Sequence, residues 1–217
     1  MSKLQLAGSI ATFAAAIFVI IAFSTPYWLV SDGKQPGEKK FERLGLWEAC
    51  LDKFHDVNYR YDIEFSGCRW IFDEEYNIII KILEPAFFVV VQVFFTLGFV
   101  GLLLGCMMLV AALFCVPHEK ETFVIKILSI VLFISSAFCT IAVITFGARG
   151  DGRDWMPDPD HNFLSWSFAL GVLGTLLDYL AAILFFVDSR VGEKRLEKQV
   201  KQEYRMEETK NKVTTVI

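Results

Sequence analysis

The sequence lacks the residue patterns on which most enzymes and metal proteins depend. Only three histidines occur among 217 residues, and they lie in three separate polar segments. No Gly-rich phosphate-binding motif, zinc-ligand spacing or EF-hand loop is found. No Asn-x-Ser/Thr sequon occurs either, so we expect no glycan on asparagine. These absences argue against catalysis and against a cofactor or resident metal, and we predict a protein that is not an enzyme.

Long apolar runs are abundant by contrast. Hydrophobic residues make up 54% of the chain and include 21 phenylalanines, which is more than the core of a soluble domain of this size needs. Four runs are long enough to cross the roughly 30 Å hydrocarbon layer as helices. We therefore predict an all-α membrane protein with a bundle of four transmembrane helices and both termini on one side.

The first apolar run follows Lys3 and could be read as a signal peptide. It is longer than the apolar core of such peptides, and Ser24-Thr25-Pro26 is not a small-x-small cleavage site. We expect an uncleaved first span. Pro85 predicts where the helix of the second span begins.

The cysteines are more informative about orientation than the basic residues, which lie in equal numbers on the two sides. Cys106, Cys115 and Cys139 fall in apolar runs, where a lone thiol behaves as a small hydrophobe. Cys50 and Cys68 lie in a long polar loop and suit a disulfide, which persists only in an oxidising compartment. Such a bridge would stabilise the loop by about 3 kcal/mol on the chain-entropy model. The alternative is two unpaired thiols.

This orientation divides the chain into nine segments. We expect a cytoplasmic N-terminus at 1–5, spans at 6–30, 84–116, 123–147 and 163–187, extracellular loops at 31–83 and 148–162, a cytoplasmic loop at 117–122 and a cytoplasmic tail at 188–217. Within the spans, the spacings Gly101xxxGly105 and Gly171xxGly174 predict close contacts between helices.

The first long loop is predicted to contain a small antiparallel β-sheet. Residues 57–65 alternate apolar and polar side chains strictly, which indicates a half-buried strand. Residues 41–47 and 68–72 are weaker strand candidates. Residues 73–83 favour a helical lead into the second span, with acidic side chains in its first turn.

Six residues between the first two spans form the pattern W…GLW…C…C: Trp28, Gly45, Leu46, Trp47, Cys50 and Cys68. This pattern and the tetraspan topology resemble the claudin superfamily, which also includes peripheral myelin protein, the epithelial membrane proteins and the gamma subunits of calcium channels and glutamate receptors. The cysteines are unusually far apart, and Leu83-Glu84-Pro85 replaces a customary arginine. The chain therefore resembles a divergent, invertebrate claudin-like protein of the septate-junction type.

The resemblance implies a rigid sheet that stands on the membrane. The disulfide would staple two strands, and the indole rings of Trp28 and Trp47 would anchor the sheet at the bilayer surface. The alternative for Trp47 is local packing alone. Arg69 falls where pore-forming claudins set charge selectivity, although we favour a structural strand arginine here.

Other residues are open to two interpretations each. Asp178 lies within the fourth span, and we favour a neutral acid hydrogen-bonded to Gln92 or to a Ser or Thr of the third span over a role in ion conduction. Arg149-Gly150-Asp151 is either an integrin-type tripeptide or a chance match. The acidic residues and His161 of the second loop could ligate calcium but fit a solvated turn better. Trp155 is a candidate partner contact or interfacial anchor.

The tail favours helix formers up to about Glu208 and carries both charge signs. Its last residues, Thr215-Val216-Ile217, match the C-terminal pattern that PDZ domains bind by strand addition, a pattern that also arises by chance.

Together these features predict a structural tetraspan component of an occluding (septate/tight-type) cell junction that contributes to the paracellular diffusion barrier. The expected location is the plasma membrane at lateral cell-cell contacts. The expected partners are the lipid bilayer, other junctional membrane proteins in cis and in trans, and a PDZ scaffold, but no nucleic acid. The alternative is an auxiliary, gamma-like subunit that regulates the gating or trafficking of a channel or receptor.

Overall fold

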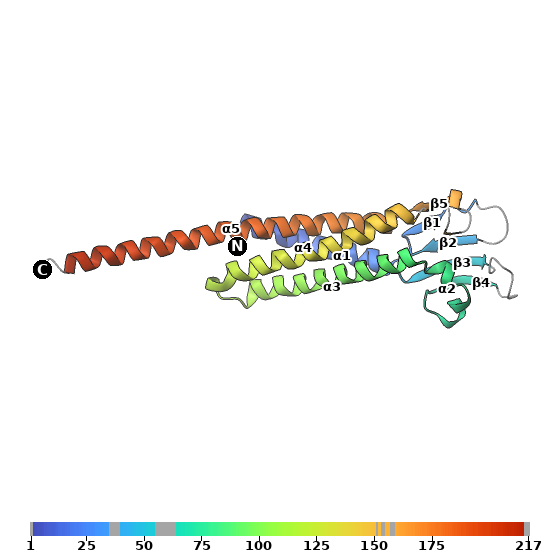
Figure 1. The fold of residues 1–217 in the computed structure, drawn as a ribbon, viewed down its shortest axis with the longest axis horizontal. Helices are drawn as coiled ribbons and strands as arrows, with labels where there is room; N and C mark the ends of the chain where they lie inside the picture. The colour runs from blue at the N-terminus through green and yellow to red at the C-terminus, as the bar shows by residue number, and fades with distance from the viewer. Residues whose placement is uncertain are drawn as a thin grey trace.

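A computed structural model places four long helices side by side, with a small β-sheet at one end of the bundle (Figure 1). The structure describes residues 2–34, 40–54, 64–150, 152, 155–156 and 159–214. The first helix begins, and the last helix ends, on the side away from the sheet. The predicted fold class, a helical membrane protein with a small antiparallel sheet, is confirmed.

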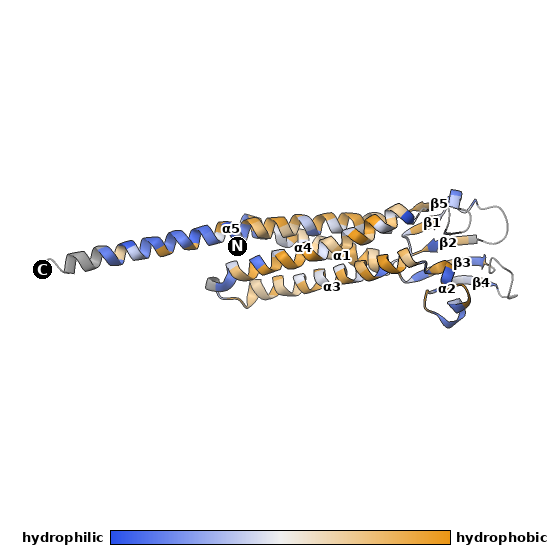
Figure 2. Ribbon diagram, viewed as in Figure 1, coloured by the Kyte–Doolittle hydropathy of each residue, from blue (hydrophilic) through white to orange (hydrophobic). Residues whose placement is uncertain are grey.

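The long helices are α1 (Lys3–Ser24), α3 (Ala86–Phe114), α4 (His118–Arg149) and α5 (Trp166–Thr214). Each contains a segment long and apolar enough to cross a membrane, and Figure 2 shows the apolar residues along these segments. Pro26 follows the end of α1, and Pro85 directly precedes α3, as predicted. The polar tail continues the helix of the fourth span, so α5 projects beyond the bundle.

Small residues let the helices approach closely. Helix α1 packs against α5 and α3, and α4 packs against α3 and α5. A Cβ on Gly101 would lie 3.1 Å from the Cβ of Ser135 on α4, and a Cβ on Gly174 would lie 2.7 Å from Val19 Cγ2 on α1. Such contacts matter in a bilayer, because lipid tails are as apolar as the helices and supply little hydrophobic drive for helix association.

The sheet consists of β1 (Leu29–Ser31), β2 (Lys40–Leu44), β3 (Glu48–Phe54), β4 (Phe65–Trp70) and β5 (Asn162–Leu164). All pairs are antiparallel, in the order β4-β3-β2-β1-β5. Strand β5 comes from the second loop, so one sheet joins the loops that follow α1 and α4. Two short helices, η1 (Glu74–Ile78) and α2 (Ile80–Leu83), connect β4 to α3.

Several strand predictions need correction. The strand predicted at 41–47 ends at Leu44, because Gly45 N donates to Glu48 O (2.8 Å) and the chain turns. The strand predicted at 68–72 lies instead at Phe65–Trp70, and the predicted helical lead at 73–83 is two short helices. Of the alternating segment at 57–65, residues 57–63 lie outside the described residues.

Candidate functional site in the sheet domain

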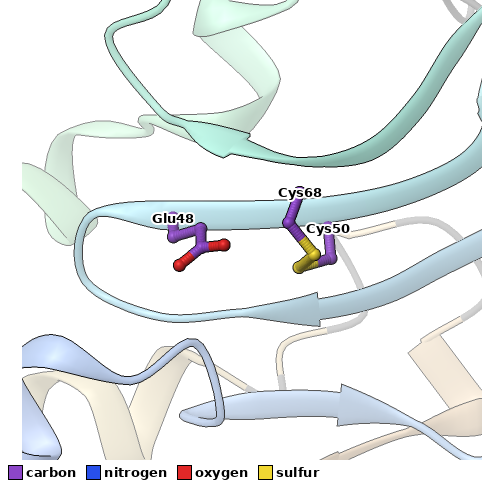
Figure 3. A group of neighbouring side chains, drawn as sticks. All are labelled: Glu48, Cys50 and Cys68. Carbon is purple, nitrogen blue, oxygen red and sulfur yellow. A yellow bond between two sulfur atoms is a disulfide. The ribbon is translucent and has the colours of Figure 1, made fainter.

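The sheet domain, which we define as β1–β5 with η1 and α2, is cross-linked by a disulfide between Cys50 and Cys68, as predicted. The two residues face each other across β3 and β4, because the antiparallel register pairs them directly (Figure 3). Cys50 is buried and Cys68 is exposed. The bond therefore joins the interior of the sheet to its surface at the outer strand pair.

Glu48 lies close to these two sulfurs, and the three side chains are the one group of potential metal ligands found among the described residues (Figure 3). A cysteine binds a metal as a thiolate, and a disulfide offers none. Glu48 alone then remains as a potential metal ligand. The geometry consequently fits a structural cross-link and does not fit a metal centre.

Arg43 on β2 covers the disulfide, an arrangement that sequence reasoning missed. Its Nε lies 3.1 Å from Cys50 Sγ and its Nη2 lies 3.3 Å from Cys68 Sγ. Its Nη1 donates to the hydroxyl of Tyr27 (3.0 Å), and the guanidinium lies 4.9 Å from the centre of the Tyr27 ring. The β2–β3 register places Arg43 opposite Cys50. The Arg43 side chain therefore links β2, the disulfide between β3 and β4, and Tyr27 in the segment that follows α1.

The Gly45-Leu46-Trp47 triplet is a turn that rests on the helix bundle. A Cβ on Gly45 would lie 2.6 Å from both Pro26 Cα and Thr25 O, so only glycine lets the two backbones meet here. Leu46 is completely buried, and its carbonyl accepts a hydrogen bond from Gln92 Nε2 on α3 (2.8 Å). The triplet thus fixes the β2–β3 turn against the end of α1 and against α3.

Replacing Gly45 with alanine is expected to destabilise the protein by about 1–3 kcal/mol, because the added methyl group meets backbone atoms rather than a flexible side chain. The measurement is thermal unfolding of the purified chain in detergent. Gly147→Ala is the matched control, because its Cβ would meet Phe168 Cζ at an ordinary 3.4 Å. Equal stability of the two variants would contradict the close approach.

Trp28 is a core residue, so its predicted role as an anchor exposed to the bilayer surface is wrong. Its side chain is 0% exposed, and its Nε1 donates to Ala22 O (2.7 Å). Its ring makes edge contacts with Phe95 and Phe146, both at 5.0 Å between ring centres. The indole therefore fills the junction between the sheet and the helices α3 and α4, and water and lipid do not reach it.

Trp47 packs locally, which was the alternative considered for it. Its ring lies 5.4 Å from Phe23 on α1 and 6.3 Å from Phe72, and it remains partly exposed. The exposed aromatic residues at this end of the bundle include Trp70 (62%), Phe72 (54%) and Trp166 (47%), which sequence reasoning did not single out. Trp70 on β4 and Trp166 at the start of α5 are thus exposed indoles that are available to the bilayer surface.

Trp155 holds the second loop onto the start of α3. Its Nε1 donates to Ile82 O (2.8 Å), and its ring packs edge-on against Phe87 (4.9 Å). Asp32 and His161 make a second link between the loops, with 3.2 Å between Oδ2 and Nδ1. Hydrogen bonds from the Lys34 backbone and from His161 lower the pKa of Asp32 below its usual value.

Arg69 forms an ion pair with Glu75 of η1 (2.9 Å) on the surface of the sheet domain. This contact supports the structural interpretation of the residue, and charge selectivity at this position stays a prediction. Tyr76 of the same short helix is buried and lies 3.3 Å from Ala49 O, to which its hydroxyl donates. Burial raises the pKa of Tyr76 to about 12, so this hydroxyl keeps its proton near neutral pH.

Asp178 is buried between three helices, 1% exposed. The hydroxyl of Ser135 on α4 lies 2.8 Å from Asp178 Oδ2 and 2.8 Å from Gly98 O on α3. A serine hydroxyl has one hydrogen, so a protonated Asp178 that donates to Ser135 lets Ser135 donate to Gly98. The contacts support the expected neutral acid bonded to a neighbouring helix, with Ser135 as the partner and not Gln92.

Asp178→Asn is expected to leave the stability within about 1 kcal/mol of the native value, because the amide is neutral and keeps a hydrogen-bonding partner in Ser135. Thermal unfolding in detergent and delivery to the cell surface check this. Asp178→Leu is the comparison and should be less stable, since it leaves Ser135 with only Gly98. A severe loss in Asp178→Asn alone would show that the charge itself is required.

Two predicted recognition sequences are incompletely described. Arg149 ends α4 and Gly150 caps it in a right-handed conformation, whereas Asp151 lies outside the described residues. The terminal residues 215–217 also lie outside them. Integrin binding and PDZ binding therefore stay predictions.

The fold and the cross-linked sheet define a class: tetraspan membrane proteins whose first long loop forms a disulfide-bridged sheet. A sequence profile described as PMP-22/EMP/MP20/Claudin tight junction matches residues 13–187. The chain belongs to this family. A search of curated proteins returned no match. Family membership, together with four apolar helices, indicates a junction-type protein of the plasma membrane that is structural rather than enzymatic and that associates with the bilayer and with other membrane proteins.

Proposed function

We propose that the protein is a structural component of an occluding cell junction, of septate or tight type, and that it contributes to assembly of the paracellular diffusion barrier. The observation that carries this proposal is the rigid attachment of the sheet domain. The disulfide crosses β3 and β4, β5 ties in the second loop, and Trp28 and Leu46 bury the contact with the helices. A barrier between cells needs a surface held at a fixed height and tilt above the membrane.

In this proposal the sheet domain lies outside the cell, because its disulfide requires an oxidising compartment. Both termini are then cytoplasmic. Neighbouring junction proteins would contact the sheet domain in cis and in trans, and residues 215–217 would attach the tail to a PDZ scaffold. The septate type is favoured by the wide cysteine spacing and by Leu83-Glu84-Pro85 before the second span.

Localisation in a polarised epithelium combined with a dye-exclusion assay tests the proposal. We expect a tagged chain to concentrate at lateral contacts, and we expect its depletion to let an extracellular dye pass between cells until the native chain is restored. An intact dye barrier after depletion, together with copurification of a channel and altered currents, would contradict the proposal and favour the auxiliary-subunit alternative.

A further inference from the structure

A groove of about 350 Å³ lies between α4 and α5 in the half of the bundle away from the sheet domain. Ile130 and Phe133 of α4 form one wall, and Ile183 and Phe186 of α5 form the other. All four side chains are half exposed, between 48% and 55%. Because both helices have the length and composition of membrane spans, the groove opens to the hydrocarbon and has room for an acyl chain.

The lipid-facing side of α5 continues beyond this groove as a row of basic residues. The row advances by three or four positions at each step, so its members stay on one side of the helix. Its exposed apolar members, followed by its exposed basic members, are Leu176, Leu180, Ile183 and Val187, then Arg190, Lys194, Lys198 and Lys201. At about 100° per residue, all eight fall within about 80° of arc. Figure 2 shows the same change from apolar to polar residues where α5 leaves the bundle, so the hydrocarbon ends between Val187 and Arg190.

Two cations stand at the mouth of the groove. The Arg190 guanidinium lies 5.7 Å from the ring centre of Phe186, which lines the groove. Lys126 lies one helical turn before Ile130 on α4, and its Nζ is 2.7 Å from Glu193 Oε1. Arg190 Nη1 is 3.2 Å from Glu193 Oε2, so both cations converge on one carboxylate. The side chains of Arg190 and Lys126 are 59% and 40% exposed, so a headgroup reaches them without any opening of the protein.

These cations keep capacity for a phosphate. A guanidinium has five N–H donors and an ammonium group has three, and Glu193 accepts from one donor of each. Two positive charges and one negative charge leave a net charge of +1 at the mouth. The phosphodiester of a lipid whose acyl chain occupies the groove therefore meets donors of the opposite charge.

The basic charge also continues outward from the mouth. Lys194 and Lys198 are exposed and lie about 6 Å and about 12 Å further along the helix axis than Arg190. The acidic residues beside them are Glu193 and Glu197, so basic side chains remain in excess. An ordinary phosphodiester needs only the cations at the mouth, whereas a phosphorylated inositol ring carries further phosphates outside its phosphodiester. The outward row consequently favours an inositol phosphate headgroup.

We propose that this site binds one phosphoinositide of the leaflet farther from the sheet domain. One acyl chain lies in the groove, the phosphodiester accepts hydrogen bonds from Arg190 and Lys126, and the ring phosphates pair with Lys194 and Lys198. The inference takes only its orientation from the proposed function, in which this leaflet is cytoplasmic and contains the inositol lipids.

Native mass spectrometry of the purified full-length chain tests the proposal. The chain is equilibrated in micelles with equal amounts of phosphatidylinositol bisphosphate, phosphatidylserine, phosphatidylcholine and cholesterol, the phospholipids having identical acyl chains. We expect one retained phosphatidylinositol bisphosphate, favoured over phosphatidylserine by about tenfold through its additional charge-assisted contacts. Lys194→Gln should lower this preference by about threefold, and Arg190→Gln should weaken retention of both anionic lipids. Excess inositol trisphosphate should not displace the lipid, because it has no acyl chain for the groove.

Arg195→Gln is the matched control. Arg195 is an exposed cation of the same helix, but it lies about 100° around the axis from Lys194 and lines a separate cavity against α1. It should retain the native preference. A loss equal to that of Lys194→Gln would reveal an effect of total charge alone and would overturn the site. Equal retention of phosphatidylserine, selective retention of cholesterol, or displacement by inositol trisphosphate would also overturn the proposal.

The fold should survive these substitutions, because Arg190→Gln leaves the ion pair between Lys126 and Glu193 in place and Lys194 lies on the exposed tail. Thermal unfolding of each variant verifies this. Binding in micelles requires neither junction assembly nor a defined orientation, so its failure is distinguishable from an intact dye barrier after depletion.

Discussion

Replacing Trp28 with alanine is expected to destabilise the protein by about 3–5 kcal/mol, the range for truncating a large buried aromatic side chain. The ring is completely buried where the sheet domain meets α3 and α4, and its loss leaves a cavity lined by Phe95 and Phe146. It also leaves Ala22 O without its indole donor. Thermal unfolding in detergent and the fraction of protein delivered to the cell surface measure the effect, and both should fall sharply.

Two further substitutions separate burial from a role at the bilayer surface. Trp28→Phe keeps most of the ring volume and loses the hydrogen bond to Ala22, so an intermediate loss is expected. Trp70→Ala removes an indole of similar size that is 62% exposed, and its effect on stability should stay within about 0.5 kcal/mol. If Trp70→Ala were as damaging as Trp28→Ala, core burial would not explain the importance of Trp28.

The helical part of the fold could be predicted from sequence because the bilayer dictates it. A span through the hydrocarbon layer needs about 20 apolar residues, and a helix satisfies its own backbone hydrogen bonds there. Composition and length therefore locate the spans. Proline adds a local signal, and Pro85 marked the start of α3 correctly. The disulfide was predictable for an equally simple reason, since Cys50 and Cys68 are the two cysteines outside the apolar runs.

The sheet was harder to predict because its order depends on pairings between distant segments. Strand β3 shows no alternation, since Ala49, Cys50 and Leu51 are all buried. Strand β5 has three residues and pairs with β1 from the other loop, a contact separated by more than a hundred positions. Hydrophobic periodicity reflects only residues that are close in sequence, so it cannot identify a partner strand this far along the chain.

For the site residues too, local sequence signals could be interpreted correctly, whereas features that depend on distant contacts could not be predicted. Trp28 was recognised as part of a signature, but its chemical character suggested the membrane interface, and only the packing of α3 and α4 around it reveals a core residue. Arg43 was missed entirely, because its hydrogen bonds to the disulfide depend on the β2–β3 register. Residue type indicates which environments a side chain tolerates, and tertiary contacts decide which of them it occupies.

Removing the disulfide by the double substitution Cys50→Ala and Cys68→Ala is expected to destabilise the sheet domain by about 3 kcal/mol, because the cross-link closes a loop of 18 residues. The sheet has five short strands and little interior of its own, so the loss should appear as local opening rather than as unfolding of the helices. Protease cleavage within the first long loop should accelerate on the order of a hundredfold, while the helical circular dichroism signal persists. Cys106→Ala is the control, since this free cysteine lies on α3.

Comparison with chemically reduced native protein separates the covalent constraint from side-chain packing. Reduction opens the bond but keeps both sulfur atoms, so Cys50 Sγ still occupies its buried site and Arg43 retains sulfur atoms as neighbours. If loop closure dominates, reduced native protein and the double variant should be cleaved at similar rates. If packing dominates, only the double variant should be cleaved rapidly, and the stabilisation would then belong to the sulfur atoms and not to the bond between them. Cleavage of both at the rate of the oxidised native chain would contradict a structural role for the bridge.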